Sequence, residues 1–129
     1  MNINTHLQIS SQLCGEPLEL GAGFCRARLV TVEVMRADDQ GLVHGGFVFG
    51  LADYAAMLAV NDPNVVLGGA ETRFLKPVRV GEELEAQARV QEENGRKRRV
   101  EVTVCRGDTE VLSGTFTCFV LDRHVLDQT

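Results

Sequence analysis

The sequence contains no tryptophan, one tyrosine and three prolines, and its basic residues are outnumbered by its acidic ones. Lysine and arginine total 13 against 18 aspartates and glutamates, so the formal net charge is −5. Proteins that bind nucleic acids usually present a basic surface and aromatic rings that stack on bases. We therefore expect no nucleic-acid partner.

Signals for export and membrane insertion are also missing. Residues 1–6 lack the basic start and the apolar run of a secretory signal, and no uninterrupted apolar stretch is long enough to span a bilayer comfortably. The four cysteines form no metal-type pair: Cys14, Cys25, Cys105 and Cys118. With no P-loop, dinucleotide fingerprint or Ser-His-Asp signature, we expect a cytoplasmic protein with reduced thiols, no membrane partner, and no bound metal or separate cofactor.

The length and apolar content predict one domain over residues 1–129, with residues 1–12 as a polar N-terminal arm or short helix. Of 129 residues, 44% are hydrophobic, which is enough for a proper core. Residues 44–61 open with two glycines and end at Asn61-Asp62-Pro63, and almost every position between is apolar. A helix that is apolar on all sides is buried. Asp53, the only formal charge from Phe47 to Val60, is therefore costly unless it is paired.

The rest of the chain predicts β-strands separated by turns. Asn94-Gly95 and Arg106-Gly107-Asp108 are hairpin signals, and Gly68-Gly69 indicates a bulge or a close backbone approach. The expected strands cover residues 18–20, 24–34, 65–75, 83–92, 98–105 and 109–121. We predict an α+β fold in which a curved antiparallel sheet, ending in a meander of about four strands, wraps around one long helix.

The strand expected over residues 24–34 alternates, although imperfectly. Phe24 shares one face with the valines at positions 30, 32 and 34, while Arg26 and Arg28 interrupt that face. The pattern favours a strand with Phe24 and the valines on its apolar side.

The spacing of the residues before and within the helix resembles the PaaI-like hot-dog thioesterases. Gly41-Leu42-Val43-His44-Gly45-Gly46 is followed by Leu51-Ala52-Asp53, with the aspartate nine residues after the histidine, and residues 71–82 resemble the strand and turn that follow. The similarity covers residues 12–121. It implies a hot-dog fold, homodimers with sheets joined edge to edge and often paired into homotetramers, and hydrolysis of acyl-CoA thioesters. Coenzyme A would then enter as part of the substrate.

The resemblance also implies roles for individual residues. Asp53 would act as base or nucleophile, a backbone N–H of Gly45 or Gly46 would polarise the thioester carbonyl, and His44 would contribute to that pocket. The family often carries asparagine six residues before the histidine, where this chain has Asp38, and an ionised aspartate cannot donate a hydrogen bond. Some relatives also carry a hydroxyl in the region of residues 67–70, whereas the next hydroxyl here is Thr72.

The residues themselves support this chemistry but leave alternatives open. A helix start offers free N–H groups and partial positive charge, so Gly45 and Gly46 form either an oxyanion hole or merely a tight turn into a packed helix. Asp53 is either catalytic or a structural carboxylate at a dimer seam, and His44 either orients substrate or caps the helix. Gly45 and Asp53 lie about 12 Å apart along one helix, so a site that uses both must combine two subunits.

Positive charge for the phosphates of coenzyme A is available after the helix. The candidates are Arg73, Lys76 and Arg79, and the run of residues 96–99 is either a further candidate or a solvated hairpin tip. A second resemblance, of Asn61-Asp62 and residues 70–120 to the effector domain of FapR-type malonyl-CoA sensors, leaves a non-catalytic acyl-CoA-binding domain as the alternative. A hydratase is a third hypothesis. The acyl group and the choice between CoA and carrier-protein thioesters are not predicted.

Overall fold

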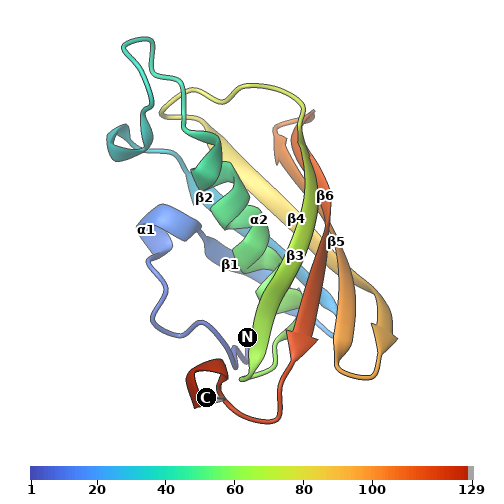
Figure 1. The fold of residues 1–129 in the computed structure, drawn as a ribbon. Helices are drawn as coiled ribbons and strands as arrows, with labels where there is room; N and C mark the ends of the chain where they lie inside the picture. The colour runs from blue at the N-terminus through green and yellow to red at the C-terminus, as the bar shows by residue number, and fades with distance from the viewer. Residues whose placement is uncertain (128–129) are drawn as a thin grey trace.

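The computed structural model describes residues 1–127, and one long helix lies across a six-stranded antiparallel sheet (Figure 1). The strands follow the order β1-β2-β4-β5-β6-β3 across the sheet. Their bounds are β1 Glu16–Gly21, β2 Phe24–Val30, β3 Val65–Phe74, β4 Glu83–Asn94, β5 Lys97–Arg106 and β6 Thr109–Val120. The helices are α1 Ser11–Cys14, α2 Gly45–Val60 and two 3₁₀ turns, η1 Glu33–Met35 and η2 Val125–Asp127. The predicted α+β hot-dog architecture is confirmed.

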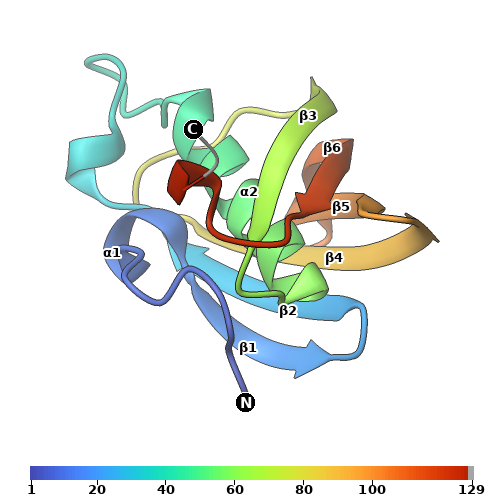
Figure 2. The same cartoon turned by 60° about the horizontal axis from the view of Figure 1, so that its bottom comes forward.

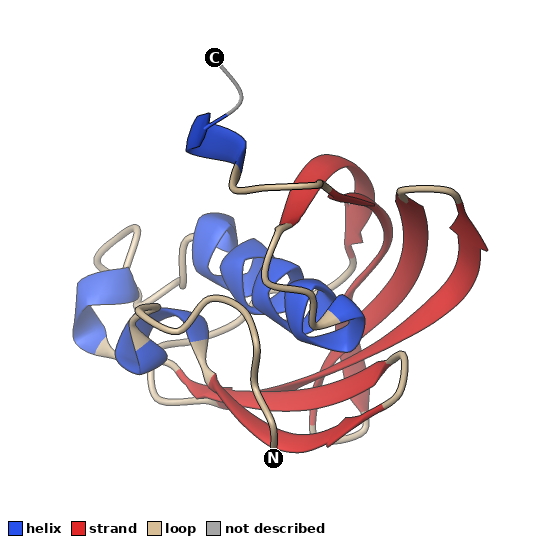
Figure 3. Cartoon of the chain, turned by 90° about the horizontal axis from the view of Figure 1, so that it is seen from below, coloured by secondary structure: helices blue, strands red, loops and turns tan. Residues whose placement is uncertain are grey.

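Helix α2 is buried because its small residues allow the sheet to approach closely. Ala52, Ala55 and Ala56 are fully buried against a sheet surface that also carries small residues, among them Ala27 and Ala86. Figure 3 shows the strands curving around the helix on one side. The predicted helix over residues 44–61 is therefore confirmed, with His44 as its N-cap and Asn61, at φ 54°, as its C-cap.

The N-terminal segment leads into α1, which lies on one side of α2 (Figure 2). The backbone amide of Asn4 donates to the Asn61 side chain at 2.8 Å, and that side chain donates back to the carbonyl of Asn2, also at 2.8 Å. Helix α1 then packs on α2. The expected polar arm thus consists of an irregular segment and a single helical turn held to the end of the central helix.

The predicted orientation of the second strand is wrong. β2 ends at Val30, and the residues that face the core are Cys25, Ala27 and Leu29. The other face carries Arg26 and Arg28, each paired with two glutamates: Arg26 with Glu19 and Glu85, Arg28 with Glu16 and Glu83. These ion pairs with neighbouring strands stabilise the arginines on the outer face of the sheet.

The predicted meander of four strands is also wrong in one respect. β4, β5 and β6 form hairpins in succession, but β3 pairs with β6 and forms the far edge of the sheet. The connection from Leu75 to Glu82 is longer than a tight hairpin, so β4 is free to pair with β2 instead. The bulge expected at Gly68-Gly69 is confirmed, and a Cβ at Gly68 would clash with the ring of Phe119.

All four cysteines are free thiols. Cys25 and Cys118 are buried, and burial raises the pKa of each to about 12. Cys14 and Cys105 are partly exposed, and burial is also the main cause that raises the pKa of each. No helix in the described part of the chain is both long and apolar enough to cross a membrane.

Candidate functional site

The start of α2 is held in place by backbone hydrogen bonds to neighbouring segments. The amide of Val43 donates to the Val78 carbonyl at 2.8 Å, and the amide of His44 donates to the Met35 carbonyl at 2.9 Å. The amide of Leu75 donates to the Val111 carbonyl at 2.8 Å. The segments before and after the helix therefore present its first turn in a fixed position.

His44 caps this first turn with its own ring. Its Nδ1 accepts a hydrogen bond of 2.8 Å from the Gly46 amide, and its carbonyl accepts one of 3.0 Å from the Phe47 amide. A neutral imidazole that accepts at Nδ1 carries its proton on Nε2, so the exposed Nε2–H remains a hydrogen-bond donor. The structure therefore confirms that His44 caps the helix. Its Nε2–H is still available to donate to a substrate.

The two glycines of the helix start have different surroundings. The Gly46 amide is used by His44, whereas the Gly45 amide has no acceptor among residues 1–127. A Cβ at Gly46 would lie 2.8 Å from Nδ1 of His44, so the cap requires glycine there. A Cβ at Gly45 would lie 3.1 Å from the ring of Phe74. Of the two predicted oxyanion donors, the geometry therefore favours the Gly45 amide.

Beside Gly45 lies an apolar pocket of about 300 Å³, which we call the helix-start pocket. It lies between the first turn of α2, the end of β3 and the connection that follows. Its lining is Leu42, Val43, Gly45, Val48, Phe74, Leu75, Lys76, Pro77, Val78 and Val111. Lys76 is the single charged residue in this set, so Gly45, whose amide is free, borders a largely apolar space.

Asp53 lies two turns further along α2, next to the buried Leu51 and Ala52. Its Oδ1 atom is buried and has no hydrogen-bond partner within residues 1–127. Burial raises the pKa of this carboxyl, and its charge in turn raises the pKa of the nearby thiols of Cys14 and Cys118. A buried carboxyl group with a raised pKa and no hydrogen-bond donor to its Oδ1 is a candidate for catalysis.

The geometry keeps these two features apart within one chain. Gly45 and Asp53 belong to the same regular helix, and eight residues correspond to about 12 Å along its axis. One carbonyl carbon cannot lie about 3 Å from both groups. The Gly45 amide and the Asp53 carboxyl of one chain therefore cannot both act on the same carbonyl carbon.

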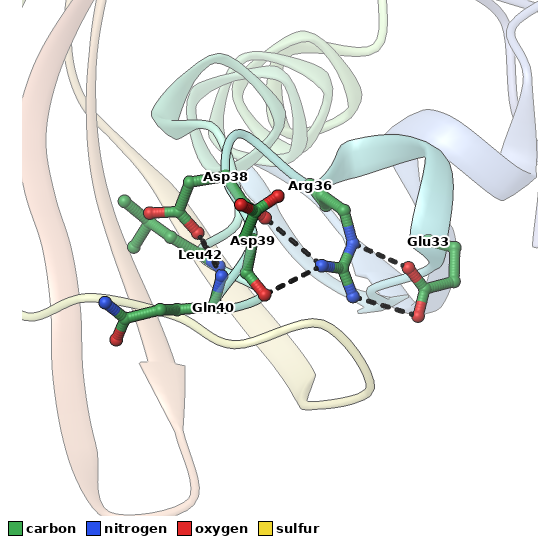
Figure 4. A network of polar contacts seen from close by, with 6 residues as sticks. All are labelled: Glu33, Arg36, Asp38, Asp39, Gln40 and Leu42. Carbon is green, nitrogen blue, oxygen red and sulfur yellow. Dashed lines mark hydrogen bonds and ion pairs between the residues drawn. The ribbon is translucent and has the colours of Figure 1, made fainter.

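Asp38 is used by its own loop (Figure 4). Its Oδ1 accepts hydrogen bonds from the amides of Gln40 at 3.0 Å and Leu42 at 3.1 Å. Arg36, paired with Glu33 on η1, donates to the backbone carbonyls of this loop. Asp38 lines a neighbouring cavity of about 410 Å³ together with Arg79 and Arg106, outside the set that lines the helix-start pocket. Its position therefore indicates a role in building the loop before α2, and a catalytic role stays a prediction.

The three candidate cations for coenzyme A do not line one common cavity. Lys76 lines the helix-start pocket, Arg79 lines the cavity beside Asp38, and Arg73 lies on the outer face of the sheet near Glu101. In the hairpin of residues 96–99 the three arginines pair with acidic residues. The pairs are Arg96 with Asp122, Arg98 with Glu93, and Arg99 with Glu92 and Glu101. The solvated-tip interpretation of this hairpin is therefore favoured.

Phe74 and Cys14 are the neighbours of the site that sequence reasoning missed. Phe74 is an exposed ring at the end of a strand, and only the packed structure brings it over Gly45. Cys14 comes near Asp53 because α1 folds onto α2. In the sequence, the apolar pair Phe74-Leu75 directly before Lys76-Pro77 was the available signal for Phe74. The sequence contained no signal for Cys14.

Comparison with known proteins identifies the family. A model of the Thioesterase superfamily matches residues 40–113, which contain the helix start, Asp53 and most of the sheet. The chain belongs to the Thioesterase superfamily. An uncharacterized protein from Pyrococcus horikoshii is similar over 98% of both chains, with 53% identity and a TM-score of 0.97. At about 20% identity, the E. coli PaaI protein and a hypothetical thioesterase from Streptococcus pneumoniae share the fold, with TM-scores of 0.79 and 0.76 over 83–87% of the chains.

Two curated relatives are longer than this member of the Thioesterase superfamily. The chain is 52% identical over 123 residues to a methylthioribose-1-phosphate isomerase from Aquifex aeolicus, of which it spans 27%. It is 31% identical over 85 residues to the transcription factor FapR from a Thermoanaerobacter species, of which it spans 42%. About three quarters of the isomerase chain has no counterpart in this protein. The isomerase name therefore assigns no role to the matching segment. The FapR similarity agrees with the second resemblance seen in the sequence.

Proposed function

We propose that this protein hydrolyses acyl-CoA thioesters at a site shared between two subunits of a dimer. The observation that carries the proposal is the pair of unmet hydrogen-bonding groups on α2: the free amide of Gly45 and the buried, unpartnered Oδ1 of Asp53. A thioesterase needs a donor for the developing oxyanion and a base or nucleophile for the attack. Because one helix holds the two groups about 12 Å apart, the site uses Asp53 of the partner subunit.

The long free edge of β3 supports such a dimer. It spans ten residues, and Gly69, Ala70 and Glu71 are exposed along it. The opposite edge, β1, is shorter and carries Pro17 and a register irregularity, which discourage pairing. Antiparallel pairing of two β3 strands around a two-fold axis would join the sheets into one.

In the proposed reaction the thioester carbonyl oxygen accepts a hydrogen bond from the Gly45 amide, aided by the Nε2–H of His44. The carboxylate of Asp53 from the partner subunit takes a proton from water, and the water oxygen forms the new bond to the acyl carbon. The C–S bond then breaks, and the thiolate receives the proton. The products are a carboxylic acid and coenzyme A, and no separate cofactor is needed. In the alternative course, Asp53 itself attacks and the mixed anhydride is hydrolysed by water.

Two further observations support CoA as the carrier and thioester hydrolysis as the reaction. The fold neighbour from Streptococcus pneumoniae was solved with coenzyme A, so CoA thioesters are the first substrates to test. The raised pKa of Asp53 suits a group that must take up a proton.

A release assay for free thiol tests the proposal. Wild-type protein should release coenzyme A from at least one member of a panel of short, medium and aromatic acyl-CoAs. Asp53→Asn should keep the fold and lower turnover at least about 100-fold, the usual scale for a positioned base. Near-normal turnover in a folded Asp53→Asn protein would contradict the assignment.

The second candidate function is an acyl-CoA-binding domain without hydrolysis, which the FapR similarity favours. It predicts measurable affinity for acyl-CoA, no thiol release from any substrate, and no effect of Asp53→Asn on binding beyond the change in charge.

A further inference from the structure

Exposed apolar side chains gather around the helix-start pocket. Val43, Val48, Val78 and Val111 form its floor and are each at most 4% exposed. The rim carries three large apolar side chains that face solvent: Leu42 at 40%, Phe74 at 57% and Leu75 at 43% exposure. A buried floor beneath an exposed apolar rim is an arrangement that bound ligands or partners usually cover.

We propose that the helix-start pocket is the acyl-binding subsite and that Phe74 limits the length of the acyl group it accepts. This inference rests on the proposed function, because it takes the Gly45 amide as the donor to the thioester carbonyl. It adds the class of substrate: thioesters of apolar acyl groups of medium length.

Position argues for the acyl group rather than for the pantetheine arm. A carbonyl at the Gly45 amide has the pocket directly beside it, because Gly45 itself lines the pocket. The pantetheine arm contains two amides, and burying them without hydrogen-bond partners would be costly. Apart from Lys76 the pocket side chains offer no polar partner, whereas an alkyl chain requires none. The arm would therefore extend from the pocket toward solvent.

Volume argues for medium length. A cavity of about 150 Å³ holds a benzene molecule, so the 300 Å³ of this pocket admits roughly twice that, or an acyl chain of about six to ten carbons. Acetyl and propionyl groups would leave most of the apolar surface uncovered. Chains of about 16 carbons would extend beyond the rim into solvent.

Phe74 forms the wall of the pocket that is easiest to change. Its ring lies over Gly45. A Cβ added at position 45 would lie 3.1 Å from Cε1 of this ring, so the absence of a side chain at Gly45 makes room for the ring. Since the side chain is 57% exposed, its replacement should disturb the core little. Phe74→Ala lengthens the available space, and Phe74→Trp shortens it.

The test is a series of straight-chain acyl-CoAs from two to sixteen carbons, with kcat/KM measured for wild type, Phe74→Ala and Phe74→Trp. In wild type each added methylene should raise kcat/KM about fourfold until the pocket is full, and the optimum should lie at about six to ten carbons. Phe74→Ala should move the optimum by about two carbons or more to longer chains, and Phe74→Trp should move it to shorter ones. Val34→Ala, a change at an exposed valine of η1, is the matched control and should leave the profile unchanged.

Identical length profiles in wild type and both Phe74 variants would overturn the proposal. The affinities of thioether analogues, which resist hydrolysis, separate it from the proposed reaction. If wild type releases no thiol but analogue affinity rises with chain length and shifts in Phe74→Ala, hydrolysis fails and the subsite stands. If affinity does not depend on chain length, and is the same in wild type and both Phe74 variants, the subsite fails whether or not wild type releases thiol.

Discussion

The ring of His44 accepts a hydrogen bond of 2.8 Å from the amide of Gly46. This bond divides the glycine pair into one amide that stabilises the helix and one, at Gly45, that is free to act on a ligand. It also fixes the tautomer of His44, so that the ring presents Nε2–H outward. A helix cap and a candidate oxyanion hole are thus built from three consecutive residues.

His44→Ala should remove this cap and lower the free energy of unfolding by about 1 kcal/mol, the usual cost of losing an N-cap side chain. His44→Asn is the matched control, because its side-chain oxygen can accept the same hydrogen bond. Denaturant unfolding of both variants should show the loss in the alanine protein and recovery in the asparagine protein. If both are destabilised equally, the hydrogen bond in the structure does not stabilise the helix. Turnover lost in both would assign a separate catalytic role to Nε2–H.

Asp53 should make the stability of the protein depend on pH. Burial raises its pKa in the folded state above the ordinary value of 3.8. Folding then favours the protonated acid, so this contribution to stability is complete below about pH 3.8 and is lost as pH rises to the raised value. Asp53→Asn lacks this titration. The difference in unfolding free energy between Asp53→Asn and wild type should therefore increase with pH through that window and then level off. A difference that is constant across the window, or one that decreases, would show that the carboxyl is satisfied in the native protein.

Charge reversal tests where the phosphates of coenzyme A bind. Lys76→Glu and Arg79→Glu should raise KM for an acyl-CoA by up to about tenfold and flatten its dependence on salt, while kcat at saturation stays near wild type. Arg73→Glu tests the third predicted cation, which lies on the outer face of the sheet. Lys97→Glu at the tip of the β4–β5 hairpin is the comparison variant. If Lys97→Glu alone changes KM, the phosphates bind at the hairpin and the three predicted cations are wrong.

The sequence was sufficient for features that depend on nearby residues. The bounds of α2 followed from Gly45-Gly46 at one end and Asn61-Asp62-Pro63 at the other, and the hairpins from Asn94-Gly95 and Gly107-Asp108. The orientation of β2 was wrong because the alternation of Phe24 with the valines was read without the glutamates of β1 and β4, which pair with Arg26 and Arg28. Cross-strand ion pairs are tertiary contacts that no local pattern contains.

The same limit applies to the site. Asp53 could be singled out because a lone charge in an apolar helix is a local signal. The position of β3 at the sheet edge could not be predicted, since strand order depends on which partner β4 finds, and with it the packing of Phe74 over Gly45 was missed. Nor could the sequence show that Asp38 turns back onto the amides of Gln40 and Leu42.

The shared site is the central claim, and two damaged chains can test it. Gly45→Pro removes the free amide at a helix position where proline is well tolerated, and the extended ψ of 130° at His44 suits a following proline. Gly45→Ala is its control, because it adds the same Cβ against Phe74 but keeps the N–H. Asp53→Ala removes the carboxylate. Each of the two homodimers, Gly45→Pro and Asp53→Ala, should be inactive because every site lacks one part, whereas Gly45→Ala should retain most of its turnover.

The decisive measurement is thiol release by a co-refolded equal mixture of Gly45→Pro and Asp53→Ala chains. In a mixed dimer, one site combines the intact Gly45 of the Asp53→Ala chain with the intact Asp53 of the Gly45→Pro chain. Random mixing makes half of the dimers mixed, each with one good site of two, so about a quarter of wild-type activity should return. A mixture that stays inactive although its subunits demonstrably exchange would contradict the shared site, and Gly45 or Asp53 would then have another role.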